Sequence, residues 1–241
     1  MVRDRVAAVR SRIVDAARRA GRDPAAVRLV AAAKTRTPEE IREAVGAGVC
    51  DIGENRVQEA EEKRGALSGE PITWHLVGHL QTNKARPAVA LFEVIHSLDS
   101  PELAERLDRL AAERGKIQRA LVQVDLAGEA TKFGLPAGEL FPALEKMARL
   151  AHLSIEGLML MPPWLEPEAV RPYFARLAER ARSARSRGLL RGLELSMGMS
   201  HDFEVAIEEG ATLVRIGTAI FGERGAGRAA APSGASAPAR R

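Results

Sequence analysis

The feature that most constrains the fold is a regular alternation of short apolar runs with longer segments of helical periodicity. Eight such runs occur, at residues 27–33, 49–52, 73–77, 94–97, 119–125, 155–159, 193–196 and 212–216. Helical patterns follow the runs, and this alternation predicts a parallel sheet. A closed barrel of eight parallel strands needs about 250 residues, close to the 241 present. We expect an α/β fold, a single (β/α)8 TIM-like barrel. A doubly wound open sheet is the alternative, but no Gly-x-Gly-x-x-Gly follows the first strand.

An extra helix and a tail flank the barrel pattern. Residues 1–22 carry Val6, Val9 and Ile13 at helical spacing, which predicts an N-terminal helix. This stretch is charged and Arg-rich without an apolar core, so we do not expect a signal peptide. Residues 225–241 are rich in Gly, Ala, Pro, Ser and Arg, which predicts a disordered tail. The expected organisation is one domain over residues 1–224 followed by that tail.

Composition argues against several classes of protein. The net charge is +4, but acidic and basic residues are interleaved on predicted helix faces, so we expect no nucleic-acid partner. No run approaches the roughly 18 apolar residues of a membrane span. Cys50 is the single cysteine, which fits a reducing compartment and a cytoplasmic location. His75 and His79 are four apart on a predicted strand and its exit, without a cysteine pair nearby, so we expect no metal site.

Lys34 closes the first predicted strand. Chemistry in such barrels lies at the carboxyl ends of the strands, and the alanines at 31–33 leave room there for a flat ring. A lysine amine at this place can form an imine with a carbonyl compound. A lysine at a strand end can equally extend its amine into solvent, which is the simpler interpretation of this stretch taken alone.

The seventh and eighth strand–helix junctions predict a phosphate site. Their sequences are Ser-Met-Gly-Met-Ser-His-Asp at 196–202 and Val-Arg-Ile-Gly-Thr at 214–218. Barrels frequently bind phosphate at these two junctions. Gly217 permits a close approach of the backbone, Ser200 and Thr218 add hydroxyl groups, and the amides at a helix start complement an anion. The alternative is that Ser200 is only a helix cap and Gly217 only a turn.

Arg215 alternates with Val214 and Ile216 in the eighth predicted strand. If these two pack against the helices, Arg215 points into the barrel. A buried arginine is costly unless it is paired, and the ring nitrogen of a bound cofactor is one partner that would suit it.

Several motifs together resemble the family of pyridoxal phosphate homeostasis proteins. They run collinearly to about residue 224, with the tail outside the match. The motifs are Ala-Lys-Thr at 33–35, Gly-Glu-Asn-Arg-Val-Gln-Glu at 53–59, Trp-His at 74–75, Gly-His-Leu-Gln-Thr-Asn-Lys at 78–84, His-Ser-Leu-Asp at 96–99, Lys-Phe-Gly at 132–134, Gly-Leu-Met at 157–159, Leu-Ser-Met-Gly-Met-Ser at 195–200 and Val-Arg-Ile-Gly-Thr at 214–218. One departure is Ala33, where the family often has serine, so one hydroxyl beside Lys34 is lost.

The resemblance implies an alanine-racemase-like barrel of PLP fold type III that binds pyridoxal 5′-phosphate. It implies a reversible Schiff base on Lys34, phosphate binding by Ser200, Gly217 and Thr218, and Arg215 near the pyridine nitrogen. It further implies that Asn55 and His75 line the pocket, and we add Met197 as soft apolar lining. No residue receives a catalytic role.

Two functions fit these expectations. One is a carrier that takes part in intracellular vitamin B6 homeostasis without turnover, with PLP-dependent apoenzymes as candidate recipients. The other is a PLP-dependent amino-acid racemase or related enzyme. A two-base racemase needs a second acid or base opposite the lysine, and racemases of this fold take a tyrosine from an added β-domain. The only tyrosine here, Tyr173, lies in a predicted outer helix. We therefore favour the carrier and expect a monomer.

Overall fold

The computed structural model describes residues 1–128 and 133–223. Eight parallel strands close into a barrel, in the order β4-β3-β2-β1-β9-β8-β7-β5, with β4 paired to β5. The strands are β1 (Arg28–Ala32), β2 (Asp51–Glu54), β3 (Thr73–Leu76), β4 (Val94–Leu98), β5 (Gln118–Asp125), β7 (Leu153–Met159), β8 (Glu194–Ser196) and β9 (Leu213–Ile216). The expected (β/α)8 barrel is confirmed, and each strand lies within two residues of its predicted place.

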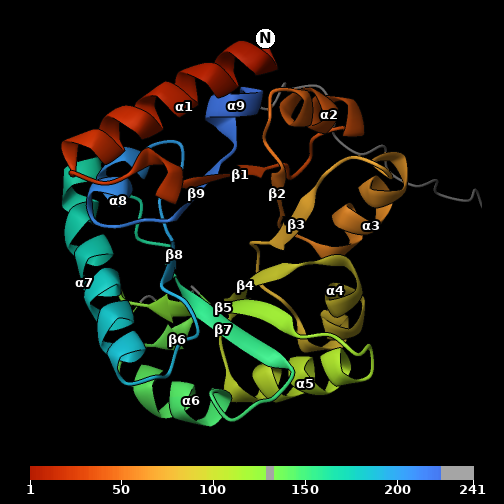
Figure 1. Ribbon diagram of the computed structural model, residues 1–241, viewed down its shortest axis with the longest axis vertical. Coiled ribbons are helices and arrows are strands. Elements are labelled where there is room, and N and C mark those ends of the chain that lie inside the picture. The colour runs from red at the N-terminus through yellow and green to blue at the C-terminus, as the bar shows by residue number, and fades with distance from the viewer. Residues whose placement is uncertain (129–132, 224–241) are drawn as a thin grey trace, which may run out of the picture.

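Helices form a ring around the barrel (Figure 1). They are α1 (Val2–Arg19), α2 (Pro38–Gly46), α3 (Val57–Ala66), α4 (Ala85–Leu91), α5 (Pro101–Ala112), α6 (Leu140–Met147), α7 (Pro167–Ser186), α8 (Phe203–Glu208) and α9 (Thr218–Phe221), with 3-10 turns at η1 (Pro24–Ala26) and η2 (Thr82–Lys84). Local sequence sets several of their starts. The helix α2 begins with a capping box, in which Thr37 and Glu40 each bond the other's backbone N–H.

One short strand and one short α-helix were not predicted from the sequence. The strand β6 (Leu135–Pro136) pairs with the carboxyl end of β5, which delays α6 to Leu140. The helix α9 follows the eighth barrel strand directly and has only four residues. Both are too short to produce a periodic pattern, and α9 places its first turn at the mouth of the barrel.

The two faces of the barrel strands differ in character. Outward-facing side chains such as Val214 and Ile216 belong to the large apolar core between the strands and helices. Inward-facing Val30 and Leu213 belong to a smaller cluster in the barrel interior. The inward orientation predicted for Arg215 is confirmed, because its side chain bonds other groups inside the barrel.

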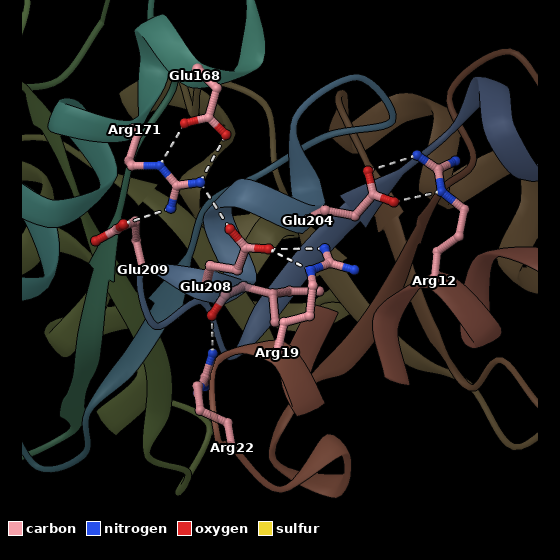
Figure 2. Close-up of polar contacts among 9 residues, drawn as sticks. Arg12, Arg19, Arg22, Glu168, Arg171, Glu204, Glu208 and Glu209 are labelled. Atoms are coloured by element: carbon pink, nitrogen blue, oxygen red, sulfur yellow. Dashed lines mark hydrogen bonds and ion pairs between the residues drawn. The ribbon is translucent and has the colours of Figure 1, made fainter. Parts of the chain in front are cut away.

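The N-terminal helix α1 packs against α8 and α9 on the outside of the barrel. Figure 2 shows the polar contacts that fix α8 in place. Arg12 of α1 makes two 2.9 Å hydrogen bonds to Glu204, and Arg19 lies 2.9 Å from Glu208. Arg171 of α7 reaches Glu208 from the other side at 2.8 Å. The helix that follows the seventh barrel strand is thus held between α1 and α7.

The predicted tail, residues 225–241, lies outside the described residues, as does Lys132 of the 132–134 motif. Within the described ranges, no helix has the length and apolar character needed to cross a membrane.

Candidate cofactor site

Lys34 lies in a turn at the carboxyl mouth of the barrel, two residues after the end of β1. The side chain is exposed, and the next residue, Thr35, has a φ of 63°. A positive φ is uncommon for residues other than glycine and often marks a functional site. Because β1 lies between β2 and β9 in the barrel, Lys34 emerges between the ends of those two strands.

The helix α3 holds the backbone on both sides of Lys34. Lys63 Nζ donates a 2.9 Å hydrogen bond to the carbonyl of Ala33. Glu59 Oε2 accepts a 3.1 Å hydrogen bond from the N–H of Thr35. The residue before Lys34 and the residue after it are therefore both tied to the same helix.

A buried ion pair supports this arrangement. Lys63 Nζ also donates to Glu54 Oε1 at 2.7 Å, and Glu54 has no exposed surface. Burial raises the pKa of Glu54 to about 7, although the hydrogen bond and the charge of Lys63 oppose the shift. Sequence reasoning missed this pair. The signal was present, since Glu54 shares the outward face of its strand with Ile52, and an acid there needs a buried partner.

The junction after β8 is built around a glycine that no other residue can replace without strain. Gly198 has a φ of 90°, and a Cβ there would come within 2.6 Å of the Cβ of Ala206 and 2.9 Å of the Cα of Phe203. Asp202 Oδ1 accepts the N–H of Met199 at 2.6 Å, so its carboxylate is used inside the loop. The close packing of Gly198 and the hydrogen bond of Asp202 together fix the loop that carries Ser200.

Ser200 meets the helix that follows β9. The N–H of Ala219 donates to Ser200 Oγ at 3.3 Å, which places the hydroxyl at the first turn of α9 beside Thr218. A Cβ on Gly217 would lie 3.3 Å from the carbonyl of Ala32, so β1 and this junction are in close contact. Ala32 is two residues before the lysine, and the two predicted phosphate junctions therefore meet next to Lys34.

Arg215 lies inside the barrel, two residues before Gly217 on β9, and is 4% exposed. Its Nη1 donates to Ser196 Oγ at 2.6 Å, and its Nη2 donates to the carbonyl of Leu160 at 2.9 Å. Burial lowers the pKa of Arg215 to about 10, while the charge of Asp202 opposes the shift. The guanidinium is therefore cationic at neutral pH.

Asn55 follows β2 directly and borders a cavity of about 480 Å³ at the mouth. Arg56, His79 and Lys84 also line this cavity. A Cβ on Gly78 would overlap the carbonyl of Asn55 at 2.2 Å, so the loop after β3 packs directly on the backbone of Asn55. The predicted place of Asn55 at the mouth agrees with this geometry.

The structure does not bring two of the predicted site residues to the mouth. Met197 has no exposed surface and packs in the outer core against the helices, because it continues the outward phase of β8. His75 is buried inside the barrel, where its ring nitrogens lie 2.8 Å from His96 Nε2 and from Asp51 Oδ1. Residues 1–128 and 133–223 hold no cluster of three or more His, Cys, Asp or Glu placed to bind a metal ion.

A lysine turn beside two junctions that carry glycine and hydroxyl residues, at the mouth of a closed (β/α)8 barrel, is the arrangement expected of an alanine-racemase-like barrel. The family model "Alanine racemase, N-terminal domain" matches residues 5–225. An alanine racemase from Clostridium difficile has the same fold, with a TM-score of 0.66 at 14% identity over 89% of this chain and 56% of that one.

Within that class, the chain belongs to the pyridoxal phosphate homeostasis protein family. The relative with this name from Aquifex aeolicus is 45% identical, covering 92% of this chain and 97% of the relative. The Pseudomonas aeruginosa relative is 42% identical, covering 92% and 96%. The solved structure of PipY from Synechococcus elongatus with PLP bound has a TM-score of 0.83 at 40% identity, covering 92% of this chain and 100% of PipY.

Proposed function

We propose that this protein binds pyridoxal 5′-phosphate at the mouth of its barrel, holds it reversibly on Lys34, and acts in PLP homeostasis as a carrier. One observation carries the proposal. The lysine turn, the Ser200 and Thr218 junction and the Arg215 guanidinium all lie on or next to the neighbouring strands β1 and β9. The lysine suits the aldehyde of pyridoxal 5′-phosphate, the junction suits its phosphate, and the guanidinium suits its ring nitrogen.

The residues present suit each part of this cofactor. When bound, the cofactor supplies an aldehyde with which a primary amine condenses reversibly. Lys34 presents such an amine on a turn whose backbone is held on both sides by α3. Ser200, Thr218 and the backbone at Gly217 offer hydroxyl and amide donors for the phosphate. Six residues form the proposed site: Lys34, Asn55, Ser200, Arg215, Gly217 and Thr218. His75 acts through Arg215, by the inference argued below.

Arg215 suits a ring nitrogen that carries no proton. Its pKa of about 10 keeps it a hydrogen-bond donor at neutral pH, and a donor faces only the lone pair of an unprotonated nitrogen. An unprotonated ring withdraws electrons less strongly, which disfavours carbanion chemistry. This supports a carrier over a racemase.

The single tyrosine supports the same choice. Tyr173 lies on α7, outside the barrel, and packs against the outer core. It therefore does not stand opposite Lys34 as a second acid or base. We further propose that residues 1–224 form the cofactor-binding domain, that the protein is a cytoplasmic monomer, and that PLP-dependent apoenzymes receive the cofactor.

The attachment is tested by labelling. Purified protein is incubated with PLP, reduced with borohydride and digested, and the modified peptide is identified by mass spectrometry. We expect the label on Lys34 and no stable visible absorption in Lys34→Ala. Lys146→Ala, at an exposed lysine of the outer helix α6, is the matched control and should bind as wild type does. A label on another lysine, or full binding by Lys34→Ala, would contradict the proposed attachment.

A further inference from the structure

The barrel interior contains a line of polar side chains that the proposed cofactor site does not use directly. It starts at Arg215 Nη1, 2.6 Å from Ser196 Oγ, which lies 2.8 Å from His96 Nδ1. The line continues from His96 Nε2 to His75 Nδ1 at 2.8 Å, and from His75 Nε2 to Asp51 Oδ1 at 2.8 Å. It therefore crosses the barrel through five strands, from β9 to β2.

The end groups determine the direction of these hydrogen bonds. Arg215 can only donate, so Ser196 Oγ accepts from it. At the other end, burial opposes the charge of Asp51, but the hydrogen bond from His75 and the charge of Arg28 outweigh burial and lower its pKa. Asp51 is therefore a carboxylate that accepts, and His75 Nε2 carries the proton between them.

The middle of the line follows from these ends. Burial, with the nearby charge of Arg215, lowers the pKa of His96 well below its ordinary value, so this ring is neutral. A neutral imidazole has one donor and one acceptor, and the Ser196 hydroxyl, which accepts from Arg215, still has its own proton to donate to His96 Nδ1. His75 Nδ1 then accepts from His96 Nε2, and His96 Nδ1 accepts from the hydroxyl of Ser196. Every contact is a hydrogen bond, and all of them run from the guanidinium to the carboxylate.

Simple filling of the core does not account for this line. The interior around it contains apolar Val30, Leu121, Met159 and Leu213, and apolar side chains could occupy the central positions as well. Buried polar groups are costly unless every one is satisfied, and here Ser196, His96 and His75 are each bonded on both sides. Arg215 is bonded to the neutral groups Ser196 Oγ, Leu160 O and Met161 Sδ, so the line connects it to a carboxylate.

The Asp51 end of the line is fixed in turn. Arg28 Nη1 lies 3.8 Å from Asp51 Oδ1, and Arg28 Nη2 lies 3.0 Å from Glu194 Oε1. These three residues lie at the amino ends of β1, β2 and β8, opposite the mouth. The carboxylate is thus anchored at the far end of the barrel.

We propose that Ser196, His96 and His75 are positioning residues for Arg215. Their one-way chain of hydrogen bonds holds the guanidinium beneath the mouth and leaves its remaining N–H groups to face a bound ring nitrogen. The inference rests on the proposed function, because Arg215 is assigned to the cofactor there. Because His75 is buried below the mouth, it does not line the site directly. The inference gives it an indirect role, through Arg215.

The first test needs no cofactor. In protein labelled with ¹⁵N, the ring nitrogens of His75 and His96 are assigned near neutral pH, with His75→Gln and His96→Gln used for assignment. We expect each ring to be neutral and to carry its proton on Nε2, with slow exchange because both are buried. A His96 ring protonated on Nδ1, or either ring doubly protonated, would overturn the chain of hydrogen bonds.

The second test uses the protein loaded with PLP. Ser196→Ala removes one acceptor from Arg215, and loss of such a bond should speed cofactor release during dialysis about tenfold. The absorption maximum should shift in the same direction as in Arg215→Leu, and Ser196→Thr should restore both values. Ser97→Ala is the control. Ser97 follows His96 on β4, and its buried hydroxyl has no hydrogen-bond partner among the described residues.

The outcomes separate the two proposals. Wild-type release and spectrum in Ser196→Ala, or equal changes in Ser196→Ala and Ser97→Ala, would refute the positioning role while leaving the cofactor site intact. If the wild-type protein does not take up PLP, the proposed function fails, and with it the assignment of Arg215 to a ring nitrogen. The ¹⁵N measurement then still decides whether the chain of hydrogen bonds exists.

Discussion

The buried carboxyl of Glu54 should make the stability of this protein depend on pH in a direction opposite to that of most paired acids. Its pKa is raised by burial from 4.5 to about 7 in the folded protein. Between these values the folded form binds a proton that the unfolded form releases. The free energy of unfolding contributed by this group therefore falls as pH rises from about 4.5 to about 7 and is flat above that range.

The magnitude follows from the size of the shift. A difference of about 2.5 pKa units, at about 1.36 kcal/mol each, corresponds to roughly 3 kcal/mol. Glu54→Gln removes the titration and keeps an acceptor for Lys63. The free energy of unfolding of wild type minus that of Glu54→Gln should therefore decrease by up to about 3 kcal/mol between pH 4.5 and pH 7.5.

Urea denaturation at closely spaced pH values measures this difference, with the free energy extrapolated linearly to zero denaturant. Glu61→Gln is the matched control, because Glu61 is an exposed residue of the same helix as Lys63. Its difference from wild type should stay constant across the range. If the Glu54→Gln and wild-type curves run parallel from pH 4.5 to 7.5, Glu54 does not titrate as its burial requires, and the reasoning is refuted.

Two further predictions concern the cofactor site. Gly198→Ala should lower the free energy of unfolding by about 2–4 kcal/mol, because the new Cβ meets Ala206 at a positive φ. Gly188→Ala, at a φ of 73° with open space around it, should cost only about 1 kcal/mol, and equal losses in the two variants would argue against a packed loop. Incubation of the PLP-loaded protein with L-alanine and other amino acids should give no D-isomer on chiral chromatography. Multiple turnovers of any amino acid would favour the racemase.

The sequence predicted the barrel because strands and helices are specified by repeating patterns. The alternation of Val214, Arg215 and Ile216 is enough to direct Arg215 inward, since a strand has a period of two. The same reasoning fails at strand ends. Met197 lies just past the strand β8, which has only three residues. So short a strand does not show in the sequence which residues face inward, so the orientation of the Met197 side chain could not be predicted.

Contacts between distant segments could not be predicted from the sequence. The bond from Lys63 to Ala33 joins residues 30 positions apart, and the bond from His96 to Ser196 joins residues 100 positions apart. His75 illustrates the consequence. Its position on a strand was clear, but its depth below the mouth depends on how far β3 extends relative to β1 and β9, and that follows from the closure of the barrel.

The exposure of Lys34 to water bears on whether the protein acts as a carrier or as an enzyme. Enzymes that generate reactive intermediates exclude water from the site, whereas Lys34 is exposed. Water at this amine favours hydrolysis of a covalent link and hence release of the intact cofactor. The groups that support it are nevertheless rigid, because Lys63 and Glu59 extend from a helix and Arg215 from a barrel strand. A site that is firmly positioned but open to water suits the reversible binding and release proposed above.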